Sequence, residues 1–305
     1  MGHEESKEPI SPQQMARRRI RTCELRAAAD YFACGQRVLD YGAGSGFVSS
    51  LIAQFGCEVE AIDVQTRPWM CWPVRLYDGV RLPYSDSAFD VVFTCFALEH
   101  LPDLSACLRE MSRVLKPGGR MIHIVPTSSW RFWSNATHYL WFARLLRSRF
   151  AVRPSAQKET AHQEPRSPGH EEHSPARRRQ HLWRLRELIS KPKSTPKILA
   201  KLRTLGWLLV PPRHGELASS ALTEIGQYRL SRWRQTFAEA SLEVVAERPT
   251  GIFDVEHLLL TNISERARIR LAQFLGSSGY VFVLRPLYSG AANGGRARVM
   301  RALAS

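Results

Sequence analysis

Short apolar runs alternate with helix-spaced patterns along the first half of the chain. The runs predict five strands, at residues 37–41, 58–63, 74–77, 90–96 and 120–125. The helical period of apolar positions predicts helices at residues 13–32, 47–55 and 104–115. The fourth run is apolar throughout, which is typical of a strand buried on both faces. Strands that alternate with helices predict an α/β fold around a parallel sheet with right-handed crossovers.

The pattern changes after residue 126. Residues 129–150 combine aromatic side chains and arginines at helical spacing, which predicts an amphipathic helix. Such a helix covers a substrate, lies on a membrane surface or packs on the core, and these three alternatives remain open. Residues 153–180 are rich in Pro, His, Glu and Arg with almost no aliphatics, so we expect disorder there. Beyond them the pattern predicts helices at 181–209, 231–240 and 256–274 and strands at 242–247 and 279–284.

Glycines cluster at the end of the first predicted strand, in the run Val-Leu-Asp-Tyr-Gly-Ala-Gly-Ser-Gly at residues 38–46. A glycine-rich turn between a strand and a helix lets backbone N–H groups and the helix N-terminus approach a ligand closely. A dinucleotide-binding fingerprint has its third glycine one position later, where this chain has Phe47. The pattern here is therefore G-x-G-x-G.

Three further landmarks follow this turn in order. Asp63 ends the second predicted strand about twenty residues after the turn, where a carboxylate accepts ribose hydroxyls. Asp78 opens the stretch between the third and fourth strands, residues 78–92. Residues 98–104 and 109–119 then carry Leu-Glu-His-Leu-Pro-Asp-Leu and Arg-Glu-Met-Ser-Arg-Val-Leu-Lys-Pro-Gly-Gly before the fifth strand.

Together these landmarks resemble the class I S-adenosylmethionine (SAM) methyltransferases, strongly over residues 37–125 and weakly beyond them. The resemblance implies a seven-stranded, mostly parallel Rossmann-like sheet with helices on both faces and a largely helical basic insertion after the fifth strand. Composition and resemblance together divide the chain into five parts. We expect a disordered N-terminus at residues 1–12, a SAM-binding core at 13–126 and a basic aromatic-rich insertion or substrate lid at 127–226, with disorder at 153–180. The C-terminal part of the fold then follows at 227–288 and a flexible tail at 289–305.

The resemblance implies SAM as the cofactor and S-adenosylhomocysteine as its product. By this resemblance the glycine-rich loop approaches SAM, and Asp40 is expected to pair, directly or through water, with the amino group of SAM. Asp63 is expected to accept the ribose hydroxyls and Asp78 to contact the adenine edge. The same carboxylates would otherwise only cap the loop or their own turns. The expected cofactor-binding residues are Asp40, Gly42, Ala43, Gly44, Gly46, Asp63, Val64, Asp78, Gly79, Cys95 and Phe96.

Two histidines are candidates for a catalytic general base on the acceptor side. His100 follows the fourth predicted strand. His214 lies in the run Pro-Pro-Arg-His-Gly-Glu, where Glu216 is a candidate to orient it and Arg213 to hold an anion. The fourth strand lacks the Asn/Asp-Pro-Pro-Tyr/Phe ending, and Cys95 is not preceded by proline. These absences disfavour methyl transfer to exocyclic nitrogens and to pyrimidine rings.

The net charge of +15 is concentrated in one part of the chain. Residues 127–226 contain 18 Lys and Arg against 7 Asp and Glu, so the rest is close to neutral. A basic segment suits a phosphate-bearing substrate, RNA or an anionic membrane surface, and is otherwise a solvated loop. The motifs favour a small-molecule, lipid-linked or glycan acceptor. An RNA methyltransferase and a non-catalytic SAM-binding protein remain alternatives, and the oligomeric state stays open.

Compartment and metal content follow from cysteine and histidine patterns. The six cysteines form no C-x-x-C pair and are interpreted as reduced thiols. The histidines at 162, 170 and 173 have no nearby cysteine and no helical H-E-x-x-H arrangement, so we predict no metal site. The first twelve residues contain no signal-peptide core, and no apolar run is long enough to span a bilayer. We therefore expect a cytoplasmic protein, with peripheral contact at the inner membrane surface left open.

Overall fold

The computed structural model describes residues 11–67, 69–150, 210–256, 260 and 262–287. The chain divides into two compact units, residues 1–137 with 212–305 and residues 138–211. Of the second unit the structure describes residues 138–150, which continue helix α4 (Ser128–Phe150), and residues 210–211. The disorder predicted at 153–180 and from 289 onward, and the helix predicted at 181–209, lie outside the described residues, as do residues 1–10.

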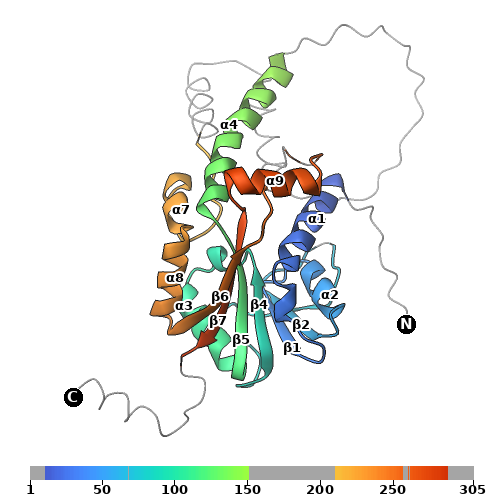
Figure 1. Cartoon of the computed structure of the whole chain (residues 1–305), viewed down its shortest axis with the longest axis vertical. Helices are drawn as coiled ribbons and strands as arrows, with labels where there is room; N and C mark the ends of the chain where they lie inside the picture. The colour runs from blue at the N-terminus through green and yellow to red at the C-terminus, as the bar shows by residue number, and fades with distance from the viewer. Residues whose placement is uncertain (1–10, 68, 151–209, 257–259, 261, 288–305) are drawn as a thin grey trace, which may run out of the picture. The chain divides into compact units, whose positions relative to one another are not determined.

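The first unit is built on a seven-stranded sheet with the order β3-β2-β1-β4-β5-β7-β6 (Figure 1). The strands are β1 (Arg37–Tyr41), β2 (Glu58–Asp63), β3 (Val74–Leu76), β4 (Phe89–Cys95), β5 (Leu115–Pro126), β6 (Leu242–Pro249) and β7 (Gly279–Pro286). All pairs from β3 to β5 are parallel, whereas β7 is antiparallel to both of its neighbours. The predicted α/β class and the mostly parallel, seven-stranded Rossmann-like sheet are confirmed.

Strand order also locates the place where a ligand binds in such a sheet. The chain adds β2 and β3 on one side of β1 and then crosses to β4 on the other side. In open α/β sheets this change of direction leaves a crevice outside the carboxyl ends of the two central strands. The glycine-rich turn after β1 and the residues after β4 lie at that crevice.

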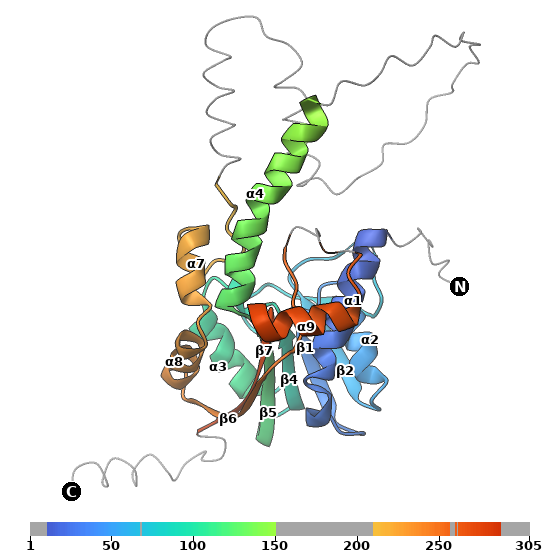
Figure 2. The ribbon, with the colours of Figure 1, turned by 45° about the horizontal axis from the view of Figure 1, so that its top comes forward.

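Helices cover both faces of the sheet (Figures 1 and 2). Helices α1 (Pro12–Arg26) and α2 (Phe47–Ala53) lie on one face, and α3 (Leu104–Val114) and α8 (Leu230–Glu239) lie on the other. Helices α7 (Ala221–Gln227) and α9 (Glu265–Leu275) complete the described set. An ion pair of 2.6 Å between Arg26 and Glu265 joins α1 to α9.

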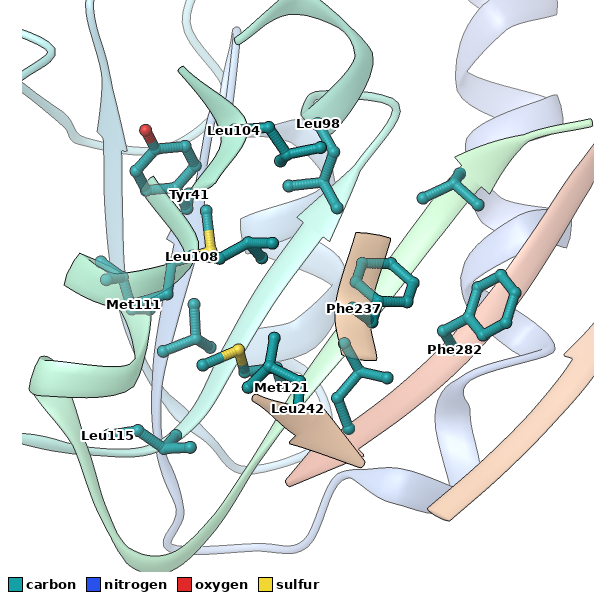
Figure 3. Packing of buried hydrophobic residues seen from close by; sticks show 14 of the residues in the cluster. Tyr41, Leu98, Leu104, Leu108, Met111, Leu115, Met121, Phe237, Leu242 and Phe282 are labelled. Atoms are coloured by element: carbon teal, nitrogen blue, oxygen red, sulfur yellow. The ribbon is translucent and has the colours of Figure 1, made fainter. Parts of the chain in front are cut away.

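The core consists of two apolar clusters, one on each face of the sheet. In β4, Phe89 and Val92 belong to one cluster, and Val91 and Phe93 belong to the other. Side chains of a strand point alternately to opposite faces, so a strand covered by helices on both sides needs apolar residues throughout. This is the reason for the continuous apolar run. Figure 3 shows the cluster under α3 and α8, where Leu108, Met111, Met121, Phe237 and Phe282 gather.

Several element boundaries differ from those predicted. Helix α1 ends at Arg26, before the predicted end at residue 32. Phe32 packs edge-on against the buried Phe93 at 5.7 Å between ring centroids, and Arg248 lies over Tyr31. Both aromatic side chains pack against the core cluster on this face of the sheet. Strand β5 begins at Leu115, so Pro-Gly-Gly lies in an irregular start of the strand, where pairing shifts between Phe89 and Val91 of β4.

Candidate active site

The glycine-rich loop joins β1 to α2 and turns tightly at two of its glycines. Gly42 and Gly46 both have a φ of +73°, in the left-handed region that favours glycine. A Cβ at position 42 would lie 2.8 Å from Cβ of Ala97, and one at position 46 would lie 2.6 Å from Cβ of Trp72. The N–H of Gly42 donates to the carbonyl oxygen of Ile62 at 2.9 Å. Both conformation and space therefore require glycine, and the backbone ties the loop to β2.

Asp63 ends β2 and holds the middle of the loop. Its Oδ2 accepts the N–H of Gly44 at 2.8 Å, and its Oδ1 accepts the N–H of Gln65 at 3.0 Å. The neighbouring Ala43 donates its N–H to the carbonyl oxygen of Ile62 at 3.1 Å. Each carboxylate oxygen of Asp63 accepts one hydrogen bond and has a further lone pair. Asp63 can therefore position the loop and accept hydroxyl groups of a ligand at the same time.

Asp78 follows β3 and lies on the surface. Its Oδ1 accepts the N–H of Val80 at 2.9 Å and the N–H of Arg81 at 3.3 Å. These two hydrogen bonds hold the pKa of Asp78 below its usual range. A Cβ at Gly79 would lie 3.3 Å from Cγ1 of Val64, so the turn lies against the end of β2. Asp78 caps its own turn, and its Oδ2 has no hydrogen bond among those described.

Asp40 lies under the loop and is buried. Its Oδ2 accepts the hydroxyl of Ser49 from α2 at 2.5 Å. Burial raises the pKa of Asp40 to about 7, against the opposing hydrogen bond of Ser49 and with a smaller contribution from the charge of Asp63. The carboxyl group therefore bridges β1 and α2 and changes its protonation state near neutral pH.

The raised pKa of Asp40 predicts a dependence of stability on pH. The folded chain holds this proton up to about pH 7, and the unfolded chain releases it near pH 4. The contribution of the Asp40 proton to the free energy of unfolding is therefore complete below pH 4, decreases as the pH rises and is absent above pH 7. Asp40→Asn should match the parent near pH 4 and exceed its free energy of unfolding at pH 8, by at most about 4 kcal/mol. Urea unfolding at both pH values measures this difference.

Asp90→Asn serves as a control of opposite sign. Burial opposes the charge of Asp90, but hydrogen bonds from the N–H of Arg37 and from Lys116 hold its pKa below the usual value. Its loss should therefore destabilise the protein at pH 8 and have less effect at pH 3. An Asp40→Asn variant that is destabilised equally at pH 4 and pH 8 would show that burial does not perturb this carboxyl group.

The end of β4 carries the two expected residues Cys95 and Phe96. Phe96 has a φ of +51°, an unusual backbone conformation for an aromatic residue and one that is found at functional sites. The guanidinium of Arg21 lies 4.1 Å from the centroid of its ring and 2.5 Å from a carboxylate oxygen of Glu24. Burial raises the pKa of the Cys95 thiol, so this cysteine is a neutral neighbour and not a nucleophile.

Helix α1 also reaches the glycine-rich loop. The guanidinium of Arg18 lies 5.0 Å from the ring centroid of Phe47 and donates to Sγ of Cys71 at 2.7 Å. The N–H of Cys71 donates to the carbonyl oxygen of Ser45 at 2.7 Å. Arg18 of α1 and the segment around Cys71 therefore contact the loop and the start of α2.

The two candidate bases, His100 and His214, lie side by side although 113 positions separate them in the sequence. Their ring centroids are 4.8 Å apart. Nε2 of His100 lies 3.8 Å from Oε1 of Glu99, and Nε2 of His214 lies 3.7 Å from the same oxygen. The ring of Trp130 packs edge-on against His214 at 4.6 Å and against Phe96 at 5.9 Å. The histidines are thus linked to the end of β4 through one aromatic side chain.

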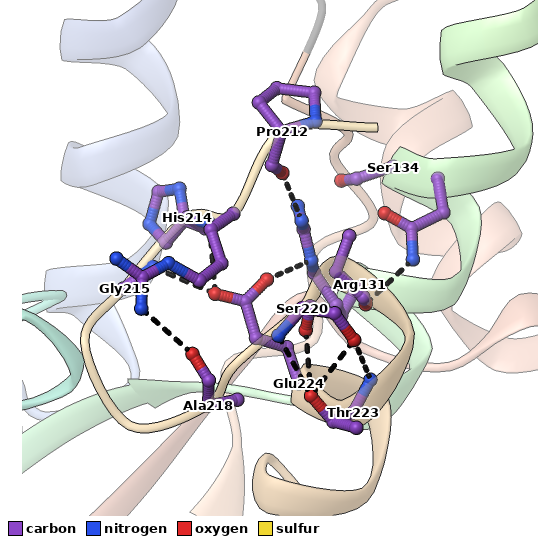
Figure 4. Close-up of polar contacts among 12 residues, drawn as sticks. Arg131, Ser134, Pro212, His214, Gly215, Ala218, Ser220, Thr223 and Glu224 are labelled. Atoms are coloured by element: carbon purple, nitrogen blue, oxygen red, sulfur yellow. Dashed lines mark hydrogen bonds and ion pairs between the residues drawn. The ribbon is translucent and has the colours of Figure 1, made fainter. Parts of the chain in front are cut away.

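A buried ion-pair network supports this group (Figure 4). Nε of Arg131 lies 2.6 Å from Oε2 of Glu224, and its Nη1 lies 3.0 Å from Oε2 of Glu256. Oε1 of Glu224 accepts the N–H groups of His214 and Gly215, both at 2.8 Å. Arg131 therefore fixes the carboxylate that in turn fixes the loop carrying His214.

The two histidines differ in their electrostatic surroundings. Burial lowers the pKa of His214, but the carboxylates of Glu256 and Glu99 outweigh it and raise the pKa to about 9. Burial also lowers the pKa of His100, where the attraction of Glu99 is insufficient to reverse it and the charge of His214 adds to the lowering. Of the two, His100 is therefore the neutral imidazole at physiological pH.

Glu216 does not orient His214, contrary to the expectation from the sequence. Its carboxylate is exposed and lies 3.2 Å from Nη2 of Arg213, while Glu256 and Glu99 face the imidazole. Sequence reasoning did not single out Glu99, although it immediately precedes His100. Arg131, Glu224 and Glu256 were missed because their pairing joins three distant segments.

No helix in the described part of the chain is long and apolar enough to cross a membrane.

The sequence is similar to known methyltransferases over the part of the chain that forms this site. Residues 39–123 match the model of a methyltransferase domain family. Demethylmenaquinone methyltransferases of Streptomyces griseus subsp. griseus and Corynebacterium urealyticum are 36% and 37% identical over 96 and 94 residues, which are 28% and 29% of this chain. The chain spans 41% of the length of each of these two relatives. A solved SAM-dependent methyltransferase of Mesorhizobium loti is 14% identical, with coverage of 86% of this chain and 97% of that one and a TM-score of 0.44.

Proposed function

We propose that this chain, whose residues 39–123 form a methyltransferase domain of the class I SAM-dependent type, transfers a methyl group from SAM to a small-molecule or lipid-linked acceptor. The observation that carries the proposal is the loop geometry. Gly42 and Gly46 require left-handed backbone at positions without room for a side chain, and the Asp63 carboxylate sits against the N–H of Gly44. This arrangement suits a ligand with a ribose next to a compact charged group.

The residues around the loop fit SAM in chemical character. Asp63 keeps acceptor capacity for the two ribose hydroxyls. Asp78 retains Oδ2 for the adenine amino group, with the turn at Gly79 beside it. SAM supplies a methyl group on a positively charged sulfur, so the protein mainly needs to orient the two reactants and exclude water. We assign orientation of the methionine part to the peptide at Cys95 and Phe96, beneath α1.

His100 and His214 are the proposed acid–base residues on the acceptor side. His100 is 45% exposed, whereas Glu99 behind it is fully buried, so the histidine is accessible from solvent. A neutral imidazole there can take a proton from an acceptor hydroxyl or carbon acid as the methyl group is transferred. His214, held between Glu99 and Glu256, then contributes positive charge that stabilises an acceptor anion.

The relatives guide the choice of acceptor class. Two of the most similar curated proteins are demethylmenaquinone methyltransferases, and we extend an acceptor of that kind, a small or lipid-linked molecule, to this chain. The charge of residues 127–226 favours RNA as a second candidate. In that case binding to RNA should weaken steeply with salt.

Transfer of labelled methyl from SAM into a cell extract tests the proposal. The extract is separated into lipid, nucleic-acid, protein and small-molecule fractions, and the Asp63→Ala variant is the control. Label in the lipid or small-molecule fraction that disappears in the variant is the expected result. Label confined to RNA would replace the acceptor assignment with the second candidate. SAM binding without label in any fraction would point to a protein that binds SAM but does not catalyse transfer.

A further inference from the structure

Three metal-binding side chains face a common point at the acceptor side. Oε1 of Glu99, Nε2 of His100 and Nε2 of His214 are mutually close, and one ligand atom from each lies within 4.8 Å of the others. Glu99 and His100 belong to the short 3₁₀ helix Leu98–His100 after β4, and His214 comes from the loop before α7. The sequence predicted no metal site because Glu99, His100 and His214 form no local ligand motif; the fold brings them together.

Glu99 has no hydrogen-bond donor of its own. Its side chain is fully buried, and neither carboxylate oxygen has a hydrogen-bond partner among the described residues. Nε2 of His214 is likewise buried without a hydrogen-bond partner. A buried carboxylate is strongly disfavoured unless a cation or several donors compensate its charge. The guanidinium of Arg21, which interacts with the charge of Glu99, is already engaged by Glu24.

The opposite side of His214 is arranged as in metal-binding histidines. Nδ1 of His214 lies 3.5 Å from Oε1 of Glu256, whose Oε2 is 3.0 Å from Nη1 of Arg131. A carboxylate at one ring nitrogen favours the proton there and leaves the lone pair on the other nitrogen. That lone pair then faces the carboxylate of Glu99. At 3.7 Å these two atoms need a positive charge between them, which is either a proton on Nε2 or a metal ion that displaces this proton.

The backbone holds the two segments in register. The N–H of Glu216 donates to the carbonyl oxygen of Glu99 at 2.8 Å, and Gly215 packs so closely on that carbonyl that a side chain at 215 would overlap it. Glu224 binds the N–H groups of His214 and Gly215 from the other side. The three ligand groups are therefore held near one another before any ion binds, as a preorganised site requires.

We infer that Glu99, His100 and His214 bind one divalent transition-metal ion of the zinc class, with Glu256 positioning His214. Two imidazoles and one carboxylate form a ligand set found in catalytic zinc sites, which keep a fourth position open. Ligands about 2.1 Å from zinc lie about 3.4 Å apart in a tetrahedron, so spacings within 4.8 Å need a contraction of about 1.4 Å or less. The open position faces the exposed side, next to His100.

An oxygen of the acceptor is the natural occupant of the open position. With the ion bound, His100 and His214 would act as ligands in place of their acid–base roles, and the ion would lower the pKa of a coordinated hydroxyl and orient it for reaction. This assignment of the acceptor as an oxygen-bearing molecule rests on the proposed methyl transfer. Binding of the ion does not, because it depends only on the three side chains and the buried charge of Glu99.

Titration of the chelator-treated full chain with Zn²⁺ in a calorimeter tests the site, with Co²⁺ as a second probe whose visible absorption reports coordination. We expect binding of one ion at this site. His100→Ala and His214→Ala should each weaken it by roughly a hundredfold or more, and Glu256→Gln by roughly 10–100-fold. Glu216→Gln, which alters an exposed carboxylate in the same loop, is the matched control and should leave affinity unchanged.

Two results would overturn the inference. One is an affinity that stays the same in both His100→Ala and His214→Ala, because the ion would then be bound elsewhere in the chain. The other is an absence of Zn²⁺ and Co²⁺ binding by the full chain, since a proton on His214 would then fill the role of the ion. His100 is half-exposed, so its variant should fold even if changes at Glu99 do not. Methyl transfer by the metal-free chain would leave the proposed function standing and reject only the assignment of the ion to the acceptor.

Discussion

Replacing Asp63 with alanine should weaken SAM binding by at least roughly a hundredfold. The variant loses the acceptors for the N–H groups of Gly44 and Gln65 and, in our proposal, for the ribose hydroxyls. Hydrogen bonds to a charged group are each worth about 1.5–3 kcal/mol, so the loss of two already gives this factor. Calorimetric titration of SAM into the parent and the variant measures it.

Asp86→Ala is the matched control for this experiment. Asp86 is also an aspartate near the end of a loop, but its side chain is 76% exposed and pairs with Arg113 away from the glycine-rich turn. Its SAM affinity should equal that of the parent. An Asp63→Ala variant that binds SAM within threefold of the parent would contradict the binding assignment of the loop.

Replacing Arg131 with methionine should lower the free energy of unfolding by about 3–5 kcal/mol. Arg131 is 1% exposed and pairs with Glu224, itself fully buried, and with Glu256. Methionine fills a similar volume but leaves a buried carboxylate without its cation. Urea unfolding followed by circular dichroism measures the change. The double variant Arg131→Met/Glu224→Gln should recover part of the loss, because it removes the uncompensated charge.

Arg234→Met is the control for the change at Arg131. Arg234 pairs with Glu247 through two hydrogen bonds, yet its side chain is 45% exposed. Ion pairs on the surface contribute about 0–1 kcal/mol, so this variant should be nearly as stable as the parent. Equal losses in Arg131→Met and Arg234→Met would mean that burial does not distinguish the two ion pairs.

The sheet and the cofactor side could largely be predicted because their signals are local. A buried parallel strand such as β4 needs apolar residues on both faces, and the turn after β1 needs glycine at fixed positions. Each of these two requirements appears as a pattern within a few consecutive residues, so it can be recognised in the sequence. Element ends were less accurate: α1 stops at Arg26, and β5 starts within a stretch that reads as a helix break.

The acceptor side could be predicted only in part, because its contacts join segments far apart. His100 and His214 were both singled out, but nothing local indicates that their rings lie 4.8 Å apart. Their proximity depends on the backbone hydrogen bond between Glu216 and Glu99 and on a buried arginine in α4. Glu216 was chosen as the orienting residue because it is near in sequence, whereas Glu256 is near in space.

The place of β7 in the sheet has a consequence for how the chain folds during synthesis. Strand β7 fills the gap between β5 and β6, so the edge of β5 stays unpaired until residues 279–286 leave the ribosome. That edge contains the apolar run Met-Ile-His-Ile-Val, and roughly 150 residues separate it from its partner. At the usual 5–20 residues per second the wait is roughly 8–30 s. During this period the nascent protein exposes the unpaired, aggregation-prone edge of β5, so aggregation competes with completion of the sheet.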